Sequence, residues 1–166
     1  RVMPNTPALI KCGASGLAKG TWATEEDLSL ALSIFNVIGV AVEVDENDLD
    51  AVTGLSGSGP AYIFYMTECL IKAGVAEGLA PDVAEILTKH MVLGAARMIT
   101  ERKEPLKRLR EMVTTPGGTT AAGLKVMNDA GYENIIMKAI KRATERSREL
   151  GAEKENIPVK KEEENQ

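Results

Sequence analysis

The amino-acid sequence predicts an α+β protein in which a small α/β segment precedes a mainly α-helical domain. Up to about residue 45, short runs of β-branched or small apolar residues flank one helical pattern, whereas beyond it the apolar residues follow helical spacing only. Aromatic residues make up only 4% of the chain, while glycine occurs 15 times. The helices must therefore pack through small and aliphatic side chains, which suits close helix–helix contacts, including contacts between two chains.

Residues 1–45 are interpreted as the end of a larger α/β domain, with the order strand, strand, helix, strand. Val2-Met3 is the predicted end of a buried strand, and residues 4–7 (PNTP) supply the turn that stops it. Residues 13–19 are small and apolar enough for a second buried strand. The β-branched run at 40–44 predicts the third.

A capping pattern followed by helical spacing predicts the helix of this segment. Thr24 is the predicted N-cap, and acidic residues fill the first turn, where they complement the helix dipole. Apolar residues then recur at helical spacing as far as Ile38. Gly39 occupies the position of the glycine that ends many helices.

Beyond this segment, proline and glycine mark the expected boundaries of helices. Pro60, Pro81 and Pro105 each fit the first turn of a helix, where a missing N–H costs nothing. Ser56–Gly59 (SGSG) is predicted to be a flexible break. The predicted helices cover residues 45–55, 60–78, 81–102, 105–113, 119–130 and, after Gly131, residues up to Gly151. We therefore expect domains at 1–45 and 46–151, followed by a disordered charged tail at 152–166.

The composition excludes several classes of protein. Two cysteines and one histidine exclude a disulfide scaffold and a cysteine- or histidine-based metal site. The formal net charge of −4 argues against nucleic-acid binding, which needs a basic face. No apolar run approaches the ~18 residues of a membrane-spanning helix, and no signal peptide is recognisable. We therefore expect a cytoplasmic protein with no membrane, nucleic-acid or metal partner.

The loop at 114–120 (TTPGGTT) carries the strongest local signal for ligand binding. Gly117 and Gly118 allow unusual backbone dihedrals, and the helix that begins near Thr119 directs its unpaired N–H groups into the loop. The hydroxyls of Thr115, Thr119 and Thr120 add hydrogen-bond donors. Such a loop binds a carboxylate without a basic side chain, or is simply a helix cap after a turn. Residue types alone favour the cap.

Two other segments carry weaker signals. Residues 53–60 (TGLSGSGP) superficially suggest a phosphate loop but match neither nucleotide-binding pattern, so a hinge between two helices is favoured, with Thr53 and Ser56 able to line a pocket. Residues 3–7 (MPNTP) follow a predicted strand, where α/β folds place ligand loops, although a structural turn is favoured. The sequence contains no recognisable triad or carboxylate pair, so any enzymatic chemistry must belong to a cofactor.

Four segments resemble pyrroline-5-carboxylate reductase, and the resemblance extends from residue 1 to about residue 151. They are Thr53–Tyr62 (TGLSGSGPAY), Val113–Leu124 (VTTPGGTTAAGL), Arg1–Pro7 (RVMPNTP) and Ala143–Leu150 (ATERSREL). The resemblance implies reduction of 1-pyrroline-5-carboxylate to L-proline, the last step of proline biosynthesis, with NADPH or NADH. It also implies a Rossmann-type dinucleotide-binding domain, of which residues 1–45 are the end, followed by a helical dimerisation domain in a homodimer or a higher multiple.

The resemblance also implies roles for particular residues. The substrate carboxylate would be bound by Thr115, Gly117, Gly118 and Thr119, with Thr53 and Ser56 near the substrate. Thr120 would be the catalytic residue, with its hydroxyl near the ring nitrogen. Pro4, Asn5 and Thr6 would lie at the nicotinamide end of the cofactor.

The sequence lacks the glycine-rich phosphate-binding turn of a complete dinucleotide-binding domain. We therefore expect the C-terminal part of such an enzyme, inactive in isolation. Two alternatives are another nicotinamide-dependent reductase with a helical second domain and a non-catalytic helical interaction module.

Overall fold

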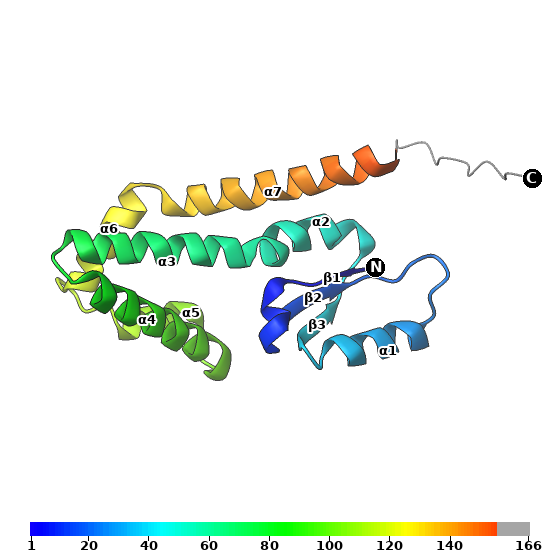
Figure 1. The fold of residues 1–166 in the computed structure, drawn as a ribbon, viewed down its shortest axis with the longest axis horizontal. Helices are drawn as coiled ribbons and strands as arrows, with labels where there is room; N and C mark the ends of the chain where they lie inside the picture. The colour runs from blue at the N-terminus through cyan, green and yellow to red at the C-terminus, as the bar shows by residue number, and fades with distance from the viewer. Residues whose placement is uncertain (156–166) are drawn as a thin grey trace, which may run out of the picture. The chain divides into compact units, whose positions relative to one another are not determined.

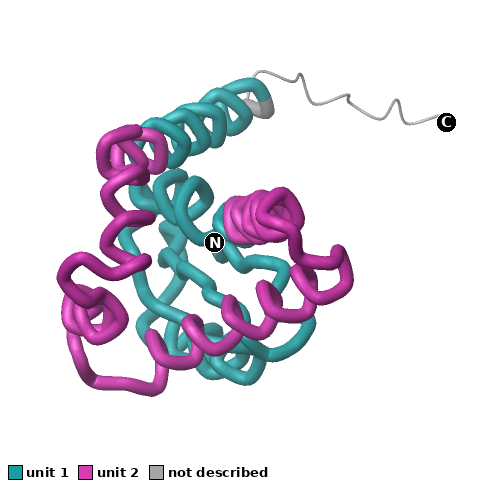
Figure 2. The backbone as a smooth tube through the Cα atoms, turned by 90° about the vertical axis from the view of Figure 1, so that its left-hand side faces the viewer, with its two compact units in different colours: residues 1–60, 137–166 teal, residues 61–136 magenta. Residues whose placement is uncertain are grey.

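The computed structural model describes residues 1–155 (Figure 1). The chain divides into two compact units, residues 1–60 with the residues from 137 onward, and residues 61–136 (Figure 2). The strands are β1 (Val2–Met3), β2 (Gly13–Leu17) and β3 (Gly39–Glu43). The α-helices are α1 (Glu25–Phe35), α2 (Leu49–Val52), α3 (Gly59–Ala76), α4 (Pro81–Glu101), α5 (Leu106–Met112), α6 (Thr119–Asp129) and α7 (Tyr132–Glu155). Two 3₁₀-helices (Thr6–Ile10 and Glu46–Asp48) and a π-helix (Thr53–Gly57) complete the described elements. The predicted α+β class, mainly helical with a small sheet, is confirmed.

The described strands form one sheet with the order β1-β2-β3. β1 pairs antiparallel with β2, and β3 pairs parallel with β2. The central strand β2 is buried almost throughout, as predicted, and Leu17 is only 1% exposed. Val2, predicted to lie in a buried strand, is exposed because β1 is a two-residue strand at the edge of the sheet.

Helix α1 begins with the predicted cap. The Thr24 hydroxyl oxygen accepts the Asp27 N–H at 3.2 Å, and the Asp27 carboxylate accepts the Thr24 N–H at 2.8 Å, which completes a capping box. The Thr24 hydroxyl also donates to this carboxylate. The Thr24 backbone N–H and, second, its hydroxyl lower the pKa of Asp27 below its ordinary value, because both hydrogen bonds favour the ionised form.

The predicted end of this helix is wrong. α1 ends at Phe35, three residues before Ile38, and the Asn36 side chain accepts the Ala41 N–H at 2.9 Å as the chain turns into β3. Gly39 is the first residue of β3, with φ of 153°. A Cβ atom at residue 39 would overlap the backbone of Gly13 on the paired strand, so the glycine serves the strand pairing and not the helix end.

The break predicted at residues 56–59 is reduced to a bend at Ser58, between a π-helix that ends at Gly57 and α3, which begins at Gly59. The chain runs from the second 3₁₀-helix through α2 and the π-helix into α3. The Ser58 N–H donates to the Thr53 carbonyl at 2.8 Å, which is the i→i−5 bond of a π-turn. The hydroxyls of Thr53 and Ser56 donate to the carbonyls of Leu49 and Val52, each four residues earlier. The hydroxyls are thus satisfied within the helical turns, although the glycines and serines of this segment favour a loop.

In the first unit, α2 and the π-helix lie between the sheet and the C-terminal part of α7. Gly16 of β2 faces Val52, where a Cβ atom would lie 2.9 Å from Val52 Cγ1. On the other side, a Cβ atom on Gly54 would lie 3.0 Å from the Ile140 carbonyl oxygen of α7. The Ser147 hydroxyl of α7 also donates to Asp50 Oδ1 at 2.6 Å. Gly16 on the sheet and Gly54 on the π-helix thus let the three layers approach closely.

Helix α7 extends beyond its predicted end at Gly151. It continues to Glu155, so residues 152–155, which were expected to be disordered, are helical. The rest of the predicted tail, residues 156–166, lies outside the described residues.

The second unit contains α4, α5, α6 and most of α3. Pro81 is the first residue of α4 and Pro105 is the N-cap of α5, within one residue of their predicted places. Pro60 is the second residue of α3, also one position from its predicted place.

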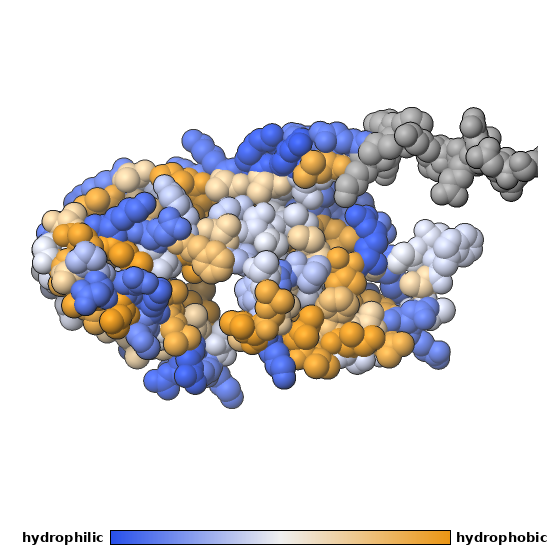
Figure 3. Space-filling view, viewed as in Figure 1, coloured by the Kyte–Doolittle hydropathy of each residue, from blue (hydrophilic) through white to orange (hydrophobic). Residues whose placement is uncertain are grey.

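Among the large apolar side chains on the surface of this unit, Phe64 is 60% exposed and Val126 is 69% exposed. Apolar side chains gather on the visible surface of the molecule (Figure 3). The described part of this unit therefore leaves much of its apolar surface uncovered.

We expect Leu17→Ala to lower the free energy of unfolding of this chain by about 2–5 kcal/mol, because it leaves a cavity at a fully buried position of β2. Leu30→Ala is the matched control, since Leu30 is 63% exposed on α1, and should change stability by less than about 0.5 kcal/mol. Urea unfolding monitored by circular dichroism measures both. Equal effects would contradict the described core.

Candidate functional site

The loop before α6 is a tight turn that depends on two adjacent glycines. The Gly118 N–H donates to the Thr115 carbonyl at 3.0 Å across Pro116 and Gly117. Gly117 has φ of 71°, as the third residue of a type II turn requires, and proline suits the second position. A Cβ atom on Gly118 would collide with the Thr115 hydroxyl oxygen. Neither glycine can therefore carry a side chain without a change in the turn.

The turn ends at the N-terminus of α6, where no side chain caps the helix. Gly118 is the N-cap residue, in extended conformation, and makes no side-chain cap. The N–H groups of Thr119, Thr120 and Ala121 belong to the first turn and have no carbonyl partner within the helix. Thr119 and Thr120 are exposed. Backbone donors and the positive end of the helix dipole therefore meet at one accessible point, which is the arrangement that binds small anions.

In this geometry some of the predicted carboxylate contacts are used within the turn, and others remain for a ligand. The Gly118 amide already donates to Thr115, so its predicted role as a donor to a ligand has no support in this turn. Gly118 instead lets the Thr115 hydroxyl oxygen lie close to its own backbone. The Thr115 hydroxyl and the amides of Thr119 and Thr120 remain as candidate donors to an anion.

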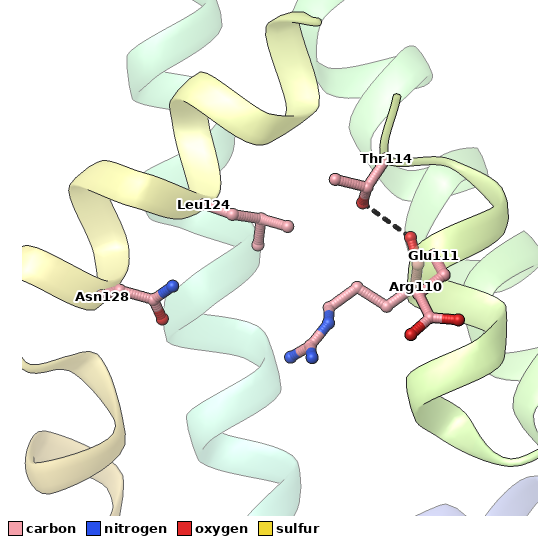
Figure 4. Close-up of a pocket in the computed structure, with 5 residues that line it drawn as sticks. All are labelled: Arg110, Glu111, Thr114, Leu124 and Asn128. Atoms are coloured by element: carbon pink, nitrogen blue, oxygen red, sulfur yellow. Dashed lines mark hydrogen bonds between the residues drawn. The ribbon is translucent and has the colours of Figure 1, made fainter. Parts of the chain in front are cut away.

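A cavity of about 300 Å³ lies between α5 and α6, next to this loop. Figure 4 shows the Arg110 side chain extending from α5 toward Leu124 and Asn128 on α6. Arg110 forms no ion pair with any residue that the structure describes. The Thr114 hydroxyl donates to the Arg110 carbonyl at 2.7 Å, which fixes the first residue of the loop to the end of α5 (Figure 4). Sequence reasoning does not single out Arg110 or Asn128; the four-residue spacing of Arg110 and Thr114 is the available signal, because it allows this bond.

In the first unit, the predicted cofactor residues lie together. Pro4, Asn5 and Thr6 line an open depression, with Ala8, Leu9, Phe35, Ile38 and Gly57 as its other lining residues. The Asn5 side chain contacts the π-helix, because Nδ2 donates to the Ser56 carbonyl at 3.0 Å. Thr53 lines a different depression, with Met3, Ser58 and residues of α7 among its neighbours.

The depression at Pro4–Thr6 fits the nicotinamide end of a reduced dinucleotide, which carries no charge. Its lining contains apolar side chains, one hydroxyl and one amide, but no charged side chain. An aromatic carboxamide ring suits these surroundings, whereas phosphate groups need cations or a glycine-rich turn. The residues present therefore fit the nicotinamide end and offer no site for the phosphates.

The two cysteines and the histidine of the chain lie on the surface. Cys12 and Cys69 are free and exposed, and His90 is exposed on α4. Within residues 1–155, no three side chains of the metal-binding types come together. In the same part of the chain, no helix has the length and apolarity needed to cross a membrane.

Comparison with known proteins shows the family of this chain. Residues 46–150 match the family model described as pyrroline-5-carboxylate reductase dimerisation. The pyrroline-5-carboxylate reductase of Methanosarcina acetivorans is 48% identical over 151 residues, which cover 91% of this chain and 56% of that protein. That of Arabidopsis thaliana is 46% identical over 150 residues, covering 90% of this chain and 54% of that protein.

Solved structures of the same family are also similar to this chain. A pyrroline-5-carboxylate reductase from Coxiella burnetii superposes with a TM-score of 0.87 at 40% identity, covering 90% of this chain and 56% of that one. The Plasmodium falciparum pyrroline carboxylate reductase, solved with NADP bound, gives 0.83 at 33% identity, with 90% and 62% covered. The chain belongs to the pyrroline-5-carboxylate reductase family, which confirms the resemblance found in its motifs. It spans about half the length of the curated relatives it matches.

We expect Gly117→Ala to lower the free energy of unfolding by about 1–2 kcal/mol, because residue 117 has a left-handed φ that alanine adopts only with strain. Gly123→Ala is the matched control inside α6, where a Cβ atom meets nothing within 4 Å. It should instead stabilise the chain, by up to about 1 kcal/mol, through helix propensity. Thermal and urea unfolding compare the two, and a destabilisation shared by both would argue against the turn geometry.

Proposed function

We propose that this chain provides the substrate-carboxylate loop and the dimerisation helices of a pyrroline-5-carboxylate reductase. That enzyme would reduce 1-pyrroline-5-carboxylate to L-proline, as the last step of proline biosynthesis. The observation that supports this most strongly is the uncapped N-terminus of α6, which follows a Pro-Gly-Gly turn in a member of this family. It also favours this function over another nicotinamide-dependent reductase or a non-catalytic helical module.

The substrate carboxylate would be bound by the backbone of the loop. The amides of Thr119 and Thr120 and the Thr115 hydroxyl are its proposed donors. Each charge-assisted hydrogen bond is worth about 1.5–3 kcal/mol, and the helix dipole adds to the attraction. Because the carboxylate is attached to the imine ring, fixing it also fixes the ring. Orientation of this kind supplies a large part of the acceleration when little acid–base chemistry is needed.

NADPH or NADH is the proposed reductant, and when bound it supplies the hydride that adds to the imine carbon. The carboxamide end of its nicotinamide would lie against Pro4, Thr6 and the second amide hydrogen of Asn5. The Thr120 hydroxyl would donate a hydrogen bond to the ring nitrogen, and the proton that this nitrogen gains as hydride adds to the neighbouring carbon would pass through this exposed hydroxyl from water. Thr53 and Ser56 remain proposed substrate-side residues, and their hydroxyl oxygens still have lone pairs to accept hydrogen bonds.

We further propose that the chain functions as a homodimer or a higher multiple. Support comes from the large apolar side chains on the surface of the second unit, such as Phe64 and Val126, which burial against a second copy would withdraw from water. Two exposed free thiols, Cys12 and Cys69, suit a reducing, cytoplasmic location.

The catalytic proposal is tested at Thr120 in a chimera that joins this chain to the part of the Methanosarcina acetivorans relative that it does not match. We expect Thr120→Ala to lower kcat for pyrroline-5-carboxylate by about 10- to 100-fold, because the ring nitrogen loses its hydrogen bond. Thr120→Ser keeps the hydroxyl and should retain most of the activity. Unchanged kcat in Thr120→Ala would remove this residue from the mechanism.

A further inference from the structure

Pro60 deprives one backbone carbonyl at the start of α3 of its helical donor. In the α-helical register of α3 the carbonyl of residue 56 would accept the N–H of residue 60, whereas the π-turn before it uses an i→i−5 bond. Proline has no N–H, so the Ser56 carbonyl needs a donor from outside the helix. Ser56 is half-buried, and a carbonyl withdrawn from water without a partner costs stability.

The Asn5 side chain supplies this donor from a distant part of the sequence. Its Nδ2 donates to the Ser56 carbonyl at 3.0 Å, and its Oδ1 accepts the Ala14 N–H of β2 at 2.9 Å. Because one partner is a carbonyl and the other an N–H, only one orientation of the amide satisfies both. Asn5 is itself half-buried. One side chain thus connects the Pro4–Thr6 segment, the sheet and the π-helix.

Two glycine contacts bring these elements close enough for that connection. The Met3 side chain lies over Gly57 of the π-helix, where a Cβ atom would be 2.5 Å from Met3 Cε. Gly16, on β2, faces Val52 at the end of α2. Both contacts lie beside the Asn5 bonds and within the same compact unit. The Asn5 amide is therefore part of a packed joint and not a surface hydrogen bond.

We infer that Asn5 is a positioning residue whose amide holds the Pro4–Thr6 segment in register with the π-helix that carries Thr53 and Ser56. Its catalytic consequence rests on the proposed function, in which the first segment contacts the cofactor and the second the substrate. The joint itself is a property of this chain alone. Asn5 thereby replaces the backbone donor that Pro60 lacks and keeps the two sides of the proposed active site in one geometry.

A double-mutant cycle between Asn5 and Pro60 tests the joint in the 166-residue chain. Asn5→Asp keeps the acceptor for Ala14 but replaces the donor to Ser56 with an oxygen, so the urea midpoint of unfolding should fall. Pro60→Ala restores an N–H at residue 60, so the same Asn5→Asp change made in that background should lower the midpoint by less than half as much. The cycle cancels effects of either change alone. Equal losses in both backgrounds would overturn the inference.

Asn36→Asp is the matched control for the added charge. Asn36 Oδ1 also accepts a strand N–H, that of Ala41 at 2.9 Å, and no donor bond from Asn36 is found in the described part of the chain. Asn36→Asp therefore adds the same charge without breaking a donor bond and, because Asn36 is exposed at the C-cap of α1, should lower the midpoint only slightly, through the helix dipole. A fall as large as that of Asn5→Asp would assign the effect to charge and overturn the inference.

Kinetics in the chimera distinguish positioning from direct contact with the cofactor. We expect Asn5→Asp to lower kcat/KM by about tenfold, mainly through a higher KM for the cofactor, and Pro60→Ala to recover part of this loss, because it replaces the donor to Ser56 but not the Asn5 amide hydrogen proposed to face the cofactor. No recovery in the Pro60→Ala background would assign the whole loss to that direct contact, and an unchanged kcat/KM would likewise exclude a positioning role. If the unaltered chimera reduces no pyrroline-5-carboxylate, the proposed function fails, while the unfolding cycle still decides whether the joint exists.

Discussion

A helix that begins without a side-chain cap is the feature on which the proposed site depends. Most helices satisfy their first N–H groups with a neighbouring serine, threonine, asparagine or aspartate. Here the N-cap is Gly118, which has no side chain to offer, and the type II turn before it uses only the Gly118 amide. The amides of Thr119 and Thr120 consequently remain for a ligand. Selectivity for a carboxylate then follows from donor geometry and the helix dipole, without a basic residue in the loop.

Different features mark the packing of the two units. In the first, glycines at 16, 54 and 57 let the sheet, the π-helix and α7 approach one another, and Asn5 joins elements that lie far apart in the sequence. In the second, the helices leave large apolar side chains such as Phe64 on the surface. The first unit is therefore held together by contacts within one chain, although it also exposes large apolar side chains such as Trp22 and Leu9, and the second suits burial against a second copy, as proposed above.

Local patterns in the sequence predicted what local interactions decide. The Thr24 cap and the proline-marked starts of α4 and α5 involve neighbours within a turn, and each was found within one residue of its expected place. Gly39 was misassigned because strand pairing with Gly13, and not the end of a helix, requires a glycine there. Only a bend at Ser58 is left of the break predicted at residues 56–59, because the chain before it forms a π-helix with an i→i−5 bond from Ser58 to Thr53, which composition does not reveal.

The candidate site shows the same difference between local features, which the sequence predicts, and long-range contacts, which it does not. Its loop was recognisable from Gly117, Gly118 and the adjacent threonines, because a tight turn and a helix start are both local features. The use of the Gly118 amide within the turn was not, since it depends on the φ value of its neighbour. The Asn5–Ser56 bond spans 51 residues, so no local pattern predicts it.

The central claim is that main-chain amides at the start of α6 bind a carboxylate. An NMR titration of the ¹⁵N-labelled chain with L-proline tests it most directly, with L-prolinamide, which lacks the carboxylate, as the control ligand. The account predicts saturable shifts of the Thr119 and Thr120 amides with proline and none with prolinamide. Unshifted amides at saturating proline, or equal shifts with both ligands, would contradict it.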